Sequence, residues 1–180
     1  MRAMVAAQGL SGIALRYFNA SGADPDGELG ELHDPETHLI PLVLNAVRNP
    51  AAPVTVMGTD YDTPDGTCVR DFLHVTDLAS AHLLALEALT GTPEFDAFNL
   101  GTGWGHSVNE IIAAAERVTG KPVAYTTAAR RPGDPPILVA DASKARAQLG
   151  WAPAHSDLDT ILGTAWRWMN APHNPFAQRG

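Results

Sequence analysis

The sequence predicts an α/β fold, because short apolar runs typical of strands alternate with longer stretches whose apolar residues recur at helical spacing. The clearest strand runs from Ile13 to Phe18. The best-specified helix covers 107–119, since Ser107 and Glu110 form a capping box and Gly120 supplies a stop. The 180 residues are 45% hydrophobic and 18% charged, which are ordinary values for a globular chain.

The chain opens with the end of a helix, followed by a strand. Small and apolar residues from Ala3 to Ala7 predict the last turns of a helix that stops at Gly9. The run from Ile13 to Phe18 shows no polar alternation, so we expect a strand buried on both faces.

A second helix and a short strand follow. Thr37 or His38 is expected to cap a helix from about Leu39 to Val47, with Pro41 in its first turn, where a missing N–H does no harm. Residues Thr55 to Gly58 then predict a short strand.

The rest of the chain alternates in the same way. Asp77 is expected to cap a helix that ends at Gly91, and a strand is expected near 95–100. After the capping-box helix, Asp141 is expected to start a helix that runs to Gly150. An apolar stripe predicts a last helix, with members Leu158, Ile161, Leu162, Ala165 and Met169.

Charge and cysteine content exclude several classes of protein. A net charge of −8 and an isoelectric point near 5.2 argue against nucleic-acid binding, which needs clustered Lys and Arg. The single cysteine, Cys68, rules out an internal disulfide and favours a reducing compartment. No apolar run is long enough to span a bilayer, and Gly9 interrupts the first apolar stretch too early for a signal peptide. We therefore expect a cytoplasmic protein with no nucleic-acid or membrane partner.

The seven histidines do not predict a metal site by their spacing. His33 and His38 lie with Asp34 and Glu36 in a polar stretch, but no zinc-ligand spacing is met. We favour a solvated loop and expect no metal. Cys68 is interpreted as a small buried residue rather than a nucleophile.

A glycine-rich segment, Gly101 to His106, matches a dinucleotide-binding fingerprint only in part. It follows an expected strand and precedes a helix, but the third glycine and the acidic residue after a second strand are absent. We interpret the segment as a structural turn rather than a pyrophosphate site.

Four segments resemble, in their order along the chain, the UDP-glucose 4-epimerase family of extended short-chain dehydrogenases/reductases. They are Leu15 to Asn19, Asp60 to Leu78, Asn99 to Gly103 and Arg130 to Asp134. The match runs from near Ile13 to the C-terminus. It implies that the chain is the C-terminal, substrate-binding portion of such an enzyme, whose NAD-binding N-terminal half has no counterpart here.

The resemblance also implies a division into domains. Residues 1–36 would be a remnant of the NAD-binding, doubly wound Rossmann-like domain. Residues 37–180 would form mainly a small mixed α/β substrate-binding domain. Within them, the strand near 95–100 and the helix over 107–119 would belong to the Rossmann-like sheet.

The catalytic pair of this superfamily, a tyrosine followed four residues later by a lysine that lowers its pKa, is absent. At that spacing Tyr17, Tyr61 and Tyr125 are followed by Ser21, Asp65 and Ala129. The family interconverts UDP-galactose and UDP-glucose through a 4-keto intermediate, using NAD. We expect no catalytic residue in this chain and no activity of the chain alone.

Two arginines and an aspartate are expected to contact a sugar nucleotide. Arg70 and Arg131 follow separate turns, so two planar, permanently charged guanidinium groups can converge on a diphosphate. By resemblance both bind the pyrophosphate, and Asp134 accepts hydrogen bonds from the uridine ribose. The alternative is that Arg70 pairs with Asp71 or Asp65 and that Arg131 is a solvated surface residue.

Further site residues are implied by the resemblance alone. Tyr17 and Phe18 match residues beside the nicotinamide, although by themselves they would be ordinary strand core. Asn19 matches a residue that bonds the sugar nucleotide, and Leu138 stands where side-chain size limits the C2 substituent, which favours plain hexoses. The segments around the uracil would supply His38, Leu39, Thr55, Val56 and Met57.

Two alternatives remain open at this stage. UDP-pentose 4-epimerases share the segment Thr63 to Thr67, and the chain would otherwise be a non-catalytic UDP-sugar-binding fragment. The family forms homodimers. Because the strands at 13–18 and 95–100 would lack their usual neighbours, we expect self-association or dependence on an N-terminal half.

Overall fold

Helices and strands alternate along the residues that the computed structural model describes, which are 2–89, 95–172 and 174. The predicted α/β class is therefore confirmed. The elements in chain order are α1 (Arg2–Gln8), β1 (Gly12–Arg16), β2 (Asn19–Ser21), α2 (Leu39–Arg48), β3 (Val54–Met57), β4 (Val69–Arg70), β5 (Phe72–His74), α3 (Val75–Glu87), β6 (Phe95–Asn99), β7 (His106–Ser107), α4 (Val108–Thr119), β8 (Tyr125–Ala128), β9 (Ile137–Leu138), α5 (Ser143–Leu149) and α6 (Leu158–Met169).

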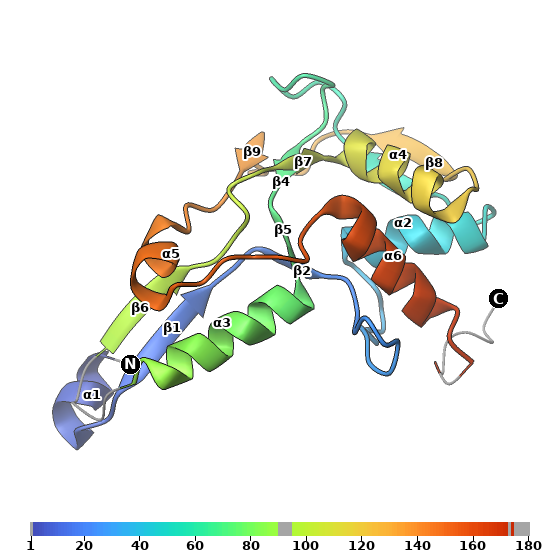
Figure 1. Cartoon of the computed structure of the whole chain (residues 1–180). Helices are drawn as coiled ribbons and strands as arrows, with labels where there is room; N and C mark the ends of the chain where they lie inside the picture. Colours follow the sequence, from blue (N-terminus) through green and yellow to red (C-terminus); the bar gives the residue numbers. More distant parts are fainter. Residues whose placement is uncertain (1, 90–94, 173, 175–180) are drawn as a thin grey trace.

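The elements are gathered into two regions at opposite ends of an elongated molecule (Figure 1). At one end β1 and β6 lie side by side, with α3 along one side and α5 on the other. At the other end α2, α4 and α6 cluster beside the parallel pair β3 and β8. The short pair β2–β5 and the three-stranded group β7–β4–β9 connect the two regions. No helix in the described ranges has both the length and the apolar character needed to cross a bilayer.

The strand β1 is less buried than its sequence predicts. It pairs in parallel with β6, from Gly12 opposite Phe95 to Arg16 opposite Asn99, and within the described residues it has no second neighbour. Its apolar side chains are half-buried, and Tyr17 and Phe18 lie beyond its end with exposed fractions of 43% and 46%. The expectation of burial on both faces is wrong for this chain, because a strand needs packed layers above and below it for that.

Two large apolar clusters and a small third one, formed by Ala23, Trp168 and Ala171, make up the core of the described residues. The largest joins α2, β3, α4 and α6, and the second joins β5, β6, α3 and α5 around Trp151. Helix α4 was expected to belong with the Rossmann-like sheet, but it packs on α2 and α6 instead, and Ile111 is fully buried there. The helices that pack beside β1 and β6 are α3 and α5.

Local signals place most helix ends correctly. The capping box of Ser107 and Glu110 is present, and Gly120 ends α4 in the left-handed conformation with φ 68°. His38 precedes α2 as expected, although its side chain makes no capping hydrogen bond. Helix α5 begins at Ser143, with the carboxylate of Asp141 accepting from its N–H at 2.9 Å.

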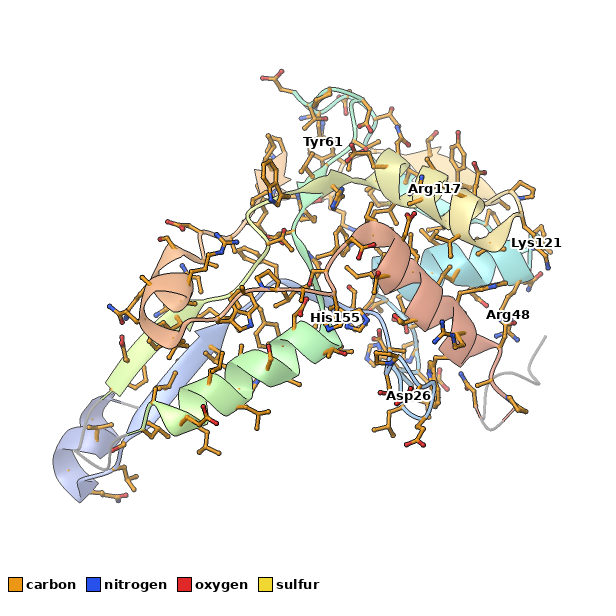
Figure 2. All side chains as sticks on the ribbon, viewed as in Figure 1. Asp26, Arg48, Tyr61, Arg117, Lys121 and His155 are labelled. Atoms are coloured by element: carbon orange, nitrogen blue, oxygen red, sulfur yellow. The ribbon has the colours of Figure 1, made fainter. Side chains whose placement is uncertain are left out.

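Helix α3 begins at Val75, three residues earlier than predicted, so the expectation that Asp77 caps it is wrong. The cap is His74, whose Nδ1 accepts from the N–H of Thr76 at 3.1 Å. The buried carboxylate of Asp77 instead accepts from the N–H groups of Ala154 and His155, both at 2.9 Å, and from the Ser156 hydroxyl. Figure 2 places His155 beside the start of α3. The helix ends at Glu87, and the predicted stop at residue 91 lies outside the described residues.

Candidate functional site

A cavity of about 1030 Å³ lies where the two regions meet, with walls from β2, the first turn of α2, β3, β4 and the first turn of α3. Ten of the twelve site residues expected from the sequence line it. These residues are Tyr17, Phe18, Asn19, His38, Leu39, Thr55, Met57, Arg70, Arg131 and Asp134. Five separate stretches of chain therefore converge on one space.

The other two expected residues, Val56 and Leu138, do not line this cavity. Successive side chains of a strand point to opposite faces. Val56 therefore points to the face opposite to that of its neighbours Thr55 and Met57, into the core, where it is 2% exposed. Leu138 is half-buried on β9, directly opposite Arg70 in the parallel pairing with β4.

Arg70 is held in place by β4 and by an acidic partner. Its side chain is 13% exposed, and its guanidinium forms an ion pair with Asp134 and donates to the carbonyl of Val69 at 2.6 Å. In the described part of the chain, neither Asp71 nor Asp65 forms an ion pair with Arg70. The guanidinium is therefore presented to the cavity in a fixed position, already paired with the residue expected to contact a ribose.

Asp71, beside Arg70, organises the wall behind it and was not predicted as a site residue. Its buried carboxylate accepts from the N–H and hydroxyl of Thr102 at 3.1 and 2.8 Å. It also accepts from the N–H groups of Gly103 at 3.3 Å and Ala140 at 3.2 Å. A Cβ on Gly101 would lie 2.5 Å from this carboxylate, so glycine is required there. The glycine-rich turn thus binds a carboxylate of its own chain, which supports its interpretation as a structural turn.

The loop that carries Arg131 is anchored by its neighbour Arg130. The Arg130 guanidinium lies 4.4 Å from the centre of the Tyr61 ring and donates to Asp60 at 2.7 Å. This hydrogen bond lowers the pKa of Asp60. The Tyr61 hydroxyl, in the loop that projects above β4 in Figure 2, donates to Asp134 at 3.4 Å. Arg131 itself is exposed at the cavity rim.

The opposite wall carries the two aromatic residues and Asn19. The Asn19 amide donates to the backbone carbonyl of Asp71 at 2.8 Å, which fixes β2 against the turn between β4 and β5.

Cys68 also lines the cavity, and burial raises the pKa of its thiol. A thiol with a raised pKa is a poor nucleophile, so the role expected of Cys68 as a packing residue agrees with its environment.

A polar loop at the rim brings together four side chains that the sequence spacing did not connect. His38 Nδ1 lies 2.5 Å from a Glu31 oxygen and 3.2 Å from a Glu36 oxygen, and His33 Nδ1 lies 3.6 Å from Glu36. Only Glu31 and His38 of these four reach the large cavity. The loop was expected to be merely solvated, because Glu31 was not considered with the histidines.

The described residues fit only part of a dinucleotide cofactor. Tyr17 and Phe18 offer aromatic faces suited to the edge of a flat ring. The N–H groups of Thr102 and Gly103 are already bonded to Asp71, so they are not free to bind a pyrophosphate. The arginines instead fit a single diphosphate at the other side of the cavity.

These features define an α/β protein with a cavity suited to an anionic ligand that has both a flat and a polar part. The family model described as "NAD dependent epimerase/dehydratase family" matches residues 1–101. The chain belongs to this family.

Curated and solved relatives agree with that assignment. The chain is 51% identical over 162 residues to a UDP-glucose 4-epimerase of Lactobacillus helveticus, covering 90% of this chain and 49% of that protein. It matches the crystal structure of a Brucella ovis UDP-glucose 4-epimerase in complex with NAD at 52% identity and a TM-score of 0.87, covering 97% of this chain and 52% of that one. A Bifidobacterium longum UDP-glucose 4-epimerase in complex with NAD+ and UDP matches at 39% identity and a TM-score of 0.87, with 96% and 51% covered.

The chain spans about half the length of the curated relatives it matches. The recognised resemblance is confirmed at the level of the family and the fold.

Proposed function

We propose that this chain supplies the UDP-sugar-binding part of an NAD-dependent UDP-hexose 4-epimerase that interconverts UDP-galactose and UDP-glucose. The observation that carries the proposal is the convergence of Arg70, Arg131, Asp134, Asn19 and the two aromatic residues on one cavity. These positions lie far apart in the sequence, and each matches a residue that the family resemblance implies for the site.

The chemistry of this wall suits a nucleoside diphosphate. Arg70 and Arg131 offer planar donors that stay charged at any pH, and a diphosphate is the anion that two such groups bind best in an otherwise acidic chain. Asp134 can exchange part of its pairing with Arg70 for the hydroxyls of a ribose. His38, Leu39, Thr55 and Met57 supply the wall that would enclose the base.

The role of this chain would be to bind and orient the nucleotide rather than to transfer a proton. NAD would supply hydride chemistry when bound, at the side of the cavity marked by Tyr17 and Phe18. Leu138 would act on sugar selection indirectly, through its position opposite Arg70. A homodimer and a cytoplasmic location remain parts of the proposal that rest on the family resemblance and on the sequence.

Calorimetry on the 180-residue chain tests this proposal. UDP, UDP-glucose and UDP-galactose should bind with similar affinity, because the diphosphate and the uridine make most of the contacts. ADP is the matched control, since it keeps the diphosphate and ribose and changes the base. Equal binding of ADP and UDP, or no binding of either, would refute the proposed site.

A second candidate function is a UDP-sugar-binding fragment without catalysis. The absence of a Tyr-Lys pair in this sequence and the bonding of the Thr102 and Gly103 N–H groups to Asp71 favour it. The chain alone is expected to bind UDP without turnover in either case, so an epimerase assay on a protein that also contains the other half of the fold distinguishes the two. A UDP-pentose 4-epimerase is tested by comparing UDP-pentoses with UDP-hexoses on a protein that also contains the other half of the fold.

A further inference from the structure

Four potential metal ligands meet in the loop before α2. Glu31, His33, Glu36 and His38 each offer one ligand atom, and these atoms all lie within 4.8 Å of one another. They come from eight consecutive residues at the junction between the large cavity and a second one of about 260 Å³, which is lined by three of the four.

The spacing of these atoms fits a small tetrahedral ion. Bonds of about 2.0–2.2 Å from zinc to nitrogen and oxygen place neighbouring ligand atoms about 3.3–3.6 Å apart. The distances from Glu36 to His38 and to His33 are 3.2 and 3.6 Å, close to that range. The 2.5 Å contact between His38 and Glu31 is a hydrogen bond. The two atoms would move apart by about 1 Å, to the spacing of two zinc ligands, when an ion replaces the shared proton.

Hydrogen bonds to the backbone hold the loop in this shape. Glu36 Oε1, the oxygen that faces both histidines, accepts from the N–H groups of Thr37 and His38, both at 2.7 Å, and an ion would bind to it alongside these bonds. The indole of Trp168 on α6 donates to the backbone carbonyl of Glu31 at 3.0 Å. A Cβ on Gly30 would lie 2.3 Å from the same indole, so the chain is packed directly on the ring. Ligands held in this way lose little freedom when they bind a metal.

The charge of the loop also calls for a cation. Among the residues that the structure describes, Glu31 and Glu36 form ion pairs with the two histidines and with no lysine or arginine. With both imidazoles neutral, the group has two carboxylates and no positive charge. Both histidine side chains are about half exposed, at 47% and 58%, so an ion can reach them from solvent.

We propose that Glu31, His33, Glu36 and His38 bind one divalent ion of the zinc type. Two imidazole nitrogens and two carboxylate oxygens form a donor set that suits Zn²⁺ and also accepts Co²⁺. The ion would link the two halves of the loop, 31–33 and 36–38, beside the first turn of α2. It would thereby stabilise the wall between the two cavities. This revises the expectation of no metal, which rested on sequence spacing alone. The proposal does not depend on UDP binding.

The test uses the 180-residue chain freed of metal with EDTA and contains no nucleotide. Calorimetry with Zn²⁺ should show one ion per chain, and Co²⁺ should give the intense visible absorption of a tetrahedral site. His33→Ala and His38→Ala should each weaken Zn²⁺ binding at least tenfold, since loss of even an outer hydrogen-bond partner costs about 10–100-fold. Glu31→Gln preserves the shape of the side chain and should give the same loss, which covers the case in which an alanine variant misfolds.

His106→Ala is the matched control. His106 lies 3.7 Å from Glu110 and forms an exposed histidine–glutamate pair without the second pair of ligands, so its loss should not change Zn²⁺ affinity. The proposal is overturned if Zn²⁺ does not bind, if His106→Ala weakens binding as much as His38→Ala, or if the double variant of His33 and His38 binds like the parent chain.

Discussion

Arg70 and Asp134 form an ion pair that joins β4 to the loop before β9, across 64 positions of sequence. The pair sets Arg70 in the cavity wall while Arg131, three residues from Asp134, stays exposed at the rim. A diphosphate that enters the cavity would therefore meet in Arg131 a donor with no ion-pair partner among the described residues. It could bind Arg70 only if that guanidinium also stayed in contact with Asp134.

Replacing Arg131 with Ala should weaken UDP binding by about 1.5–3 kcal/mol, the range for a hydrogen bond to a charged group. Calorimetry measures the change. The control is Arg130→Ala, because Arg130 is occupied by Asp60 and the Tyr61 ring and should affect binding less. An unchanged dissociation constant for Arg131→Ala would show that Arg131 is a solvated surface residue that does not bind the nucleotide.

The chain alone should show no epimerase activity when NAD is added. The physical reason is that none of its tyrosines has a lysine four residues later to lower its pKa, so the proton-transfer group is missing. A coupled assay for interconversion of UDP-galactose and UDP-glucose checks this. Measurable turnover by the pure chain would contradict it.

Asp71→Asn should lower the free energy of unfolding by about 2–4 kcal/mol. An amide turns one acceptor oxygen into a donor, which would face the N–H groups that the carboxylate now binds, and buried donors without acceptors are costly. Urea unfolding gives the value. Asp159→Asn, on the exposed ion pair with Arg117, should leave stability nearly unchanged. Equal effects of the two substitutions would show that the Asp71 network is not structural.

Stability should fall as the pH is lowered below about 6.5, through His74. Burial lowers the pKa of this imidazole, whose Nδ1 accepts from Thr76 and whose Nε2 lies 3.0 Å from the Thr164 hydroxyl. Below its ordinary value of 6.5 the unfolded state binds the proton more readily, so the stabilisation is full above that pH and is lost as the pH approaches the lower, folded value.

Urea unfolding at several pH values measures this slope. His74→Gln should flatten it, whereas His82→Ala, on an exposed site of α3, should leave it as in the parent chain. A slope that persists in His74→Gln would assign the pH dependence to another group.

The chain should self-associate. In the described residues β1 has β6 as its one neighbour, and the apolar side chains Leu83 and Leu86 on α3 are 64% and 66% exposed. An unpaired strand edge beside exposed apolar surface favours association. Light scattering measures the mass of the particle in solution, and a monodisperse monomer would contradict the prediction.

The sequence by itself determined the fold class and most of the helices, and its resemblance to a known family supplied twelve expected site residues, of which ten line the cavity. Helix α4 is an example of a local signal, because the capping box spans only Ser107 to Glu110 and Gly120 ends the helix by its own backbone conformation. Arg70 and Arg131 were expected at the site because the short segments that carry them match those of the family.

Only the tertiary structure decided where these elements lie and which side chains meet. Nothing local to α4 tells whether its apolar face packs on α2 and α6 or on a sheet, since either partner buries the same surface. Val56 points away from the cavity because of its position in β3. His74 caps α3, so the carboxylate of Asp77 is available to bind the loop at 154–156. The pairing of Arg70 with Asp134 and the meeting of Glu31 with His38 depend likewise on how the chain folds back on itself. Local hydrogen bonds determine where an element begins and ends, whereas its partners are chosen by packing across the whole chain.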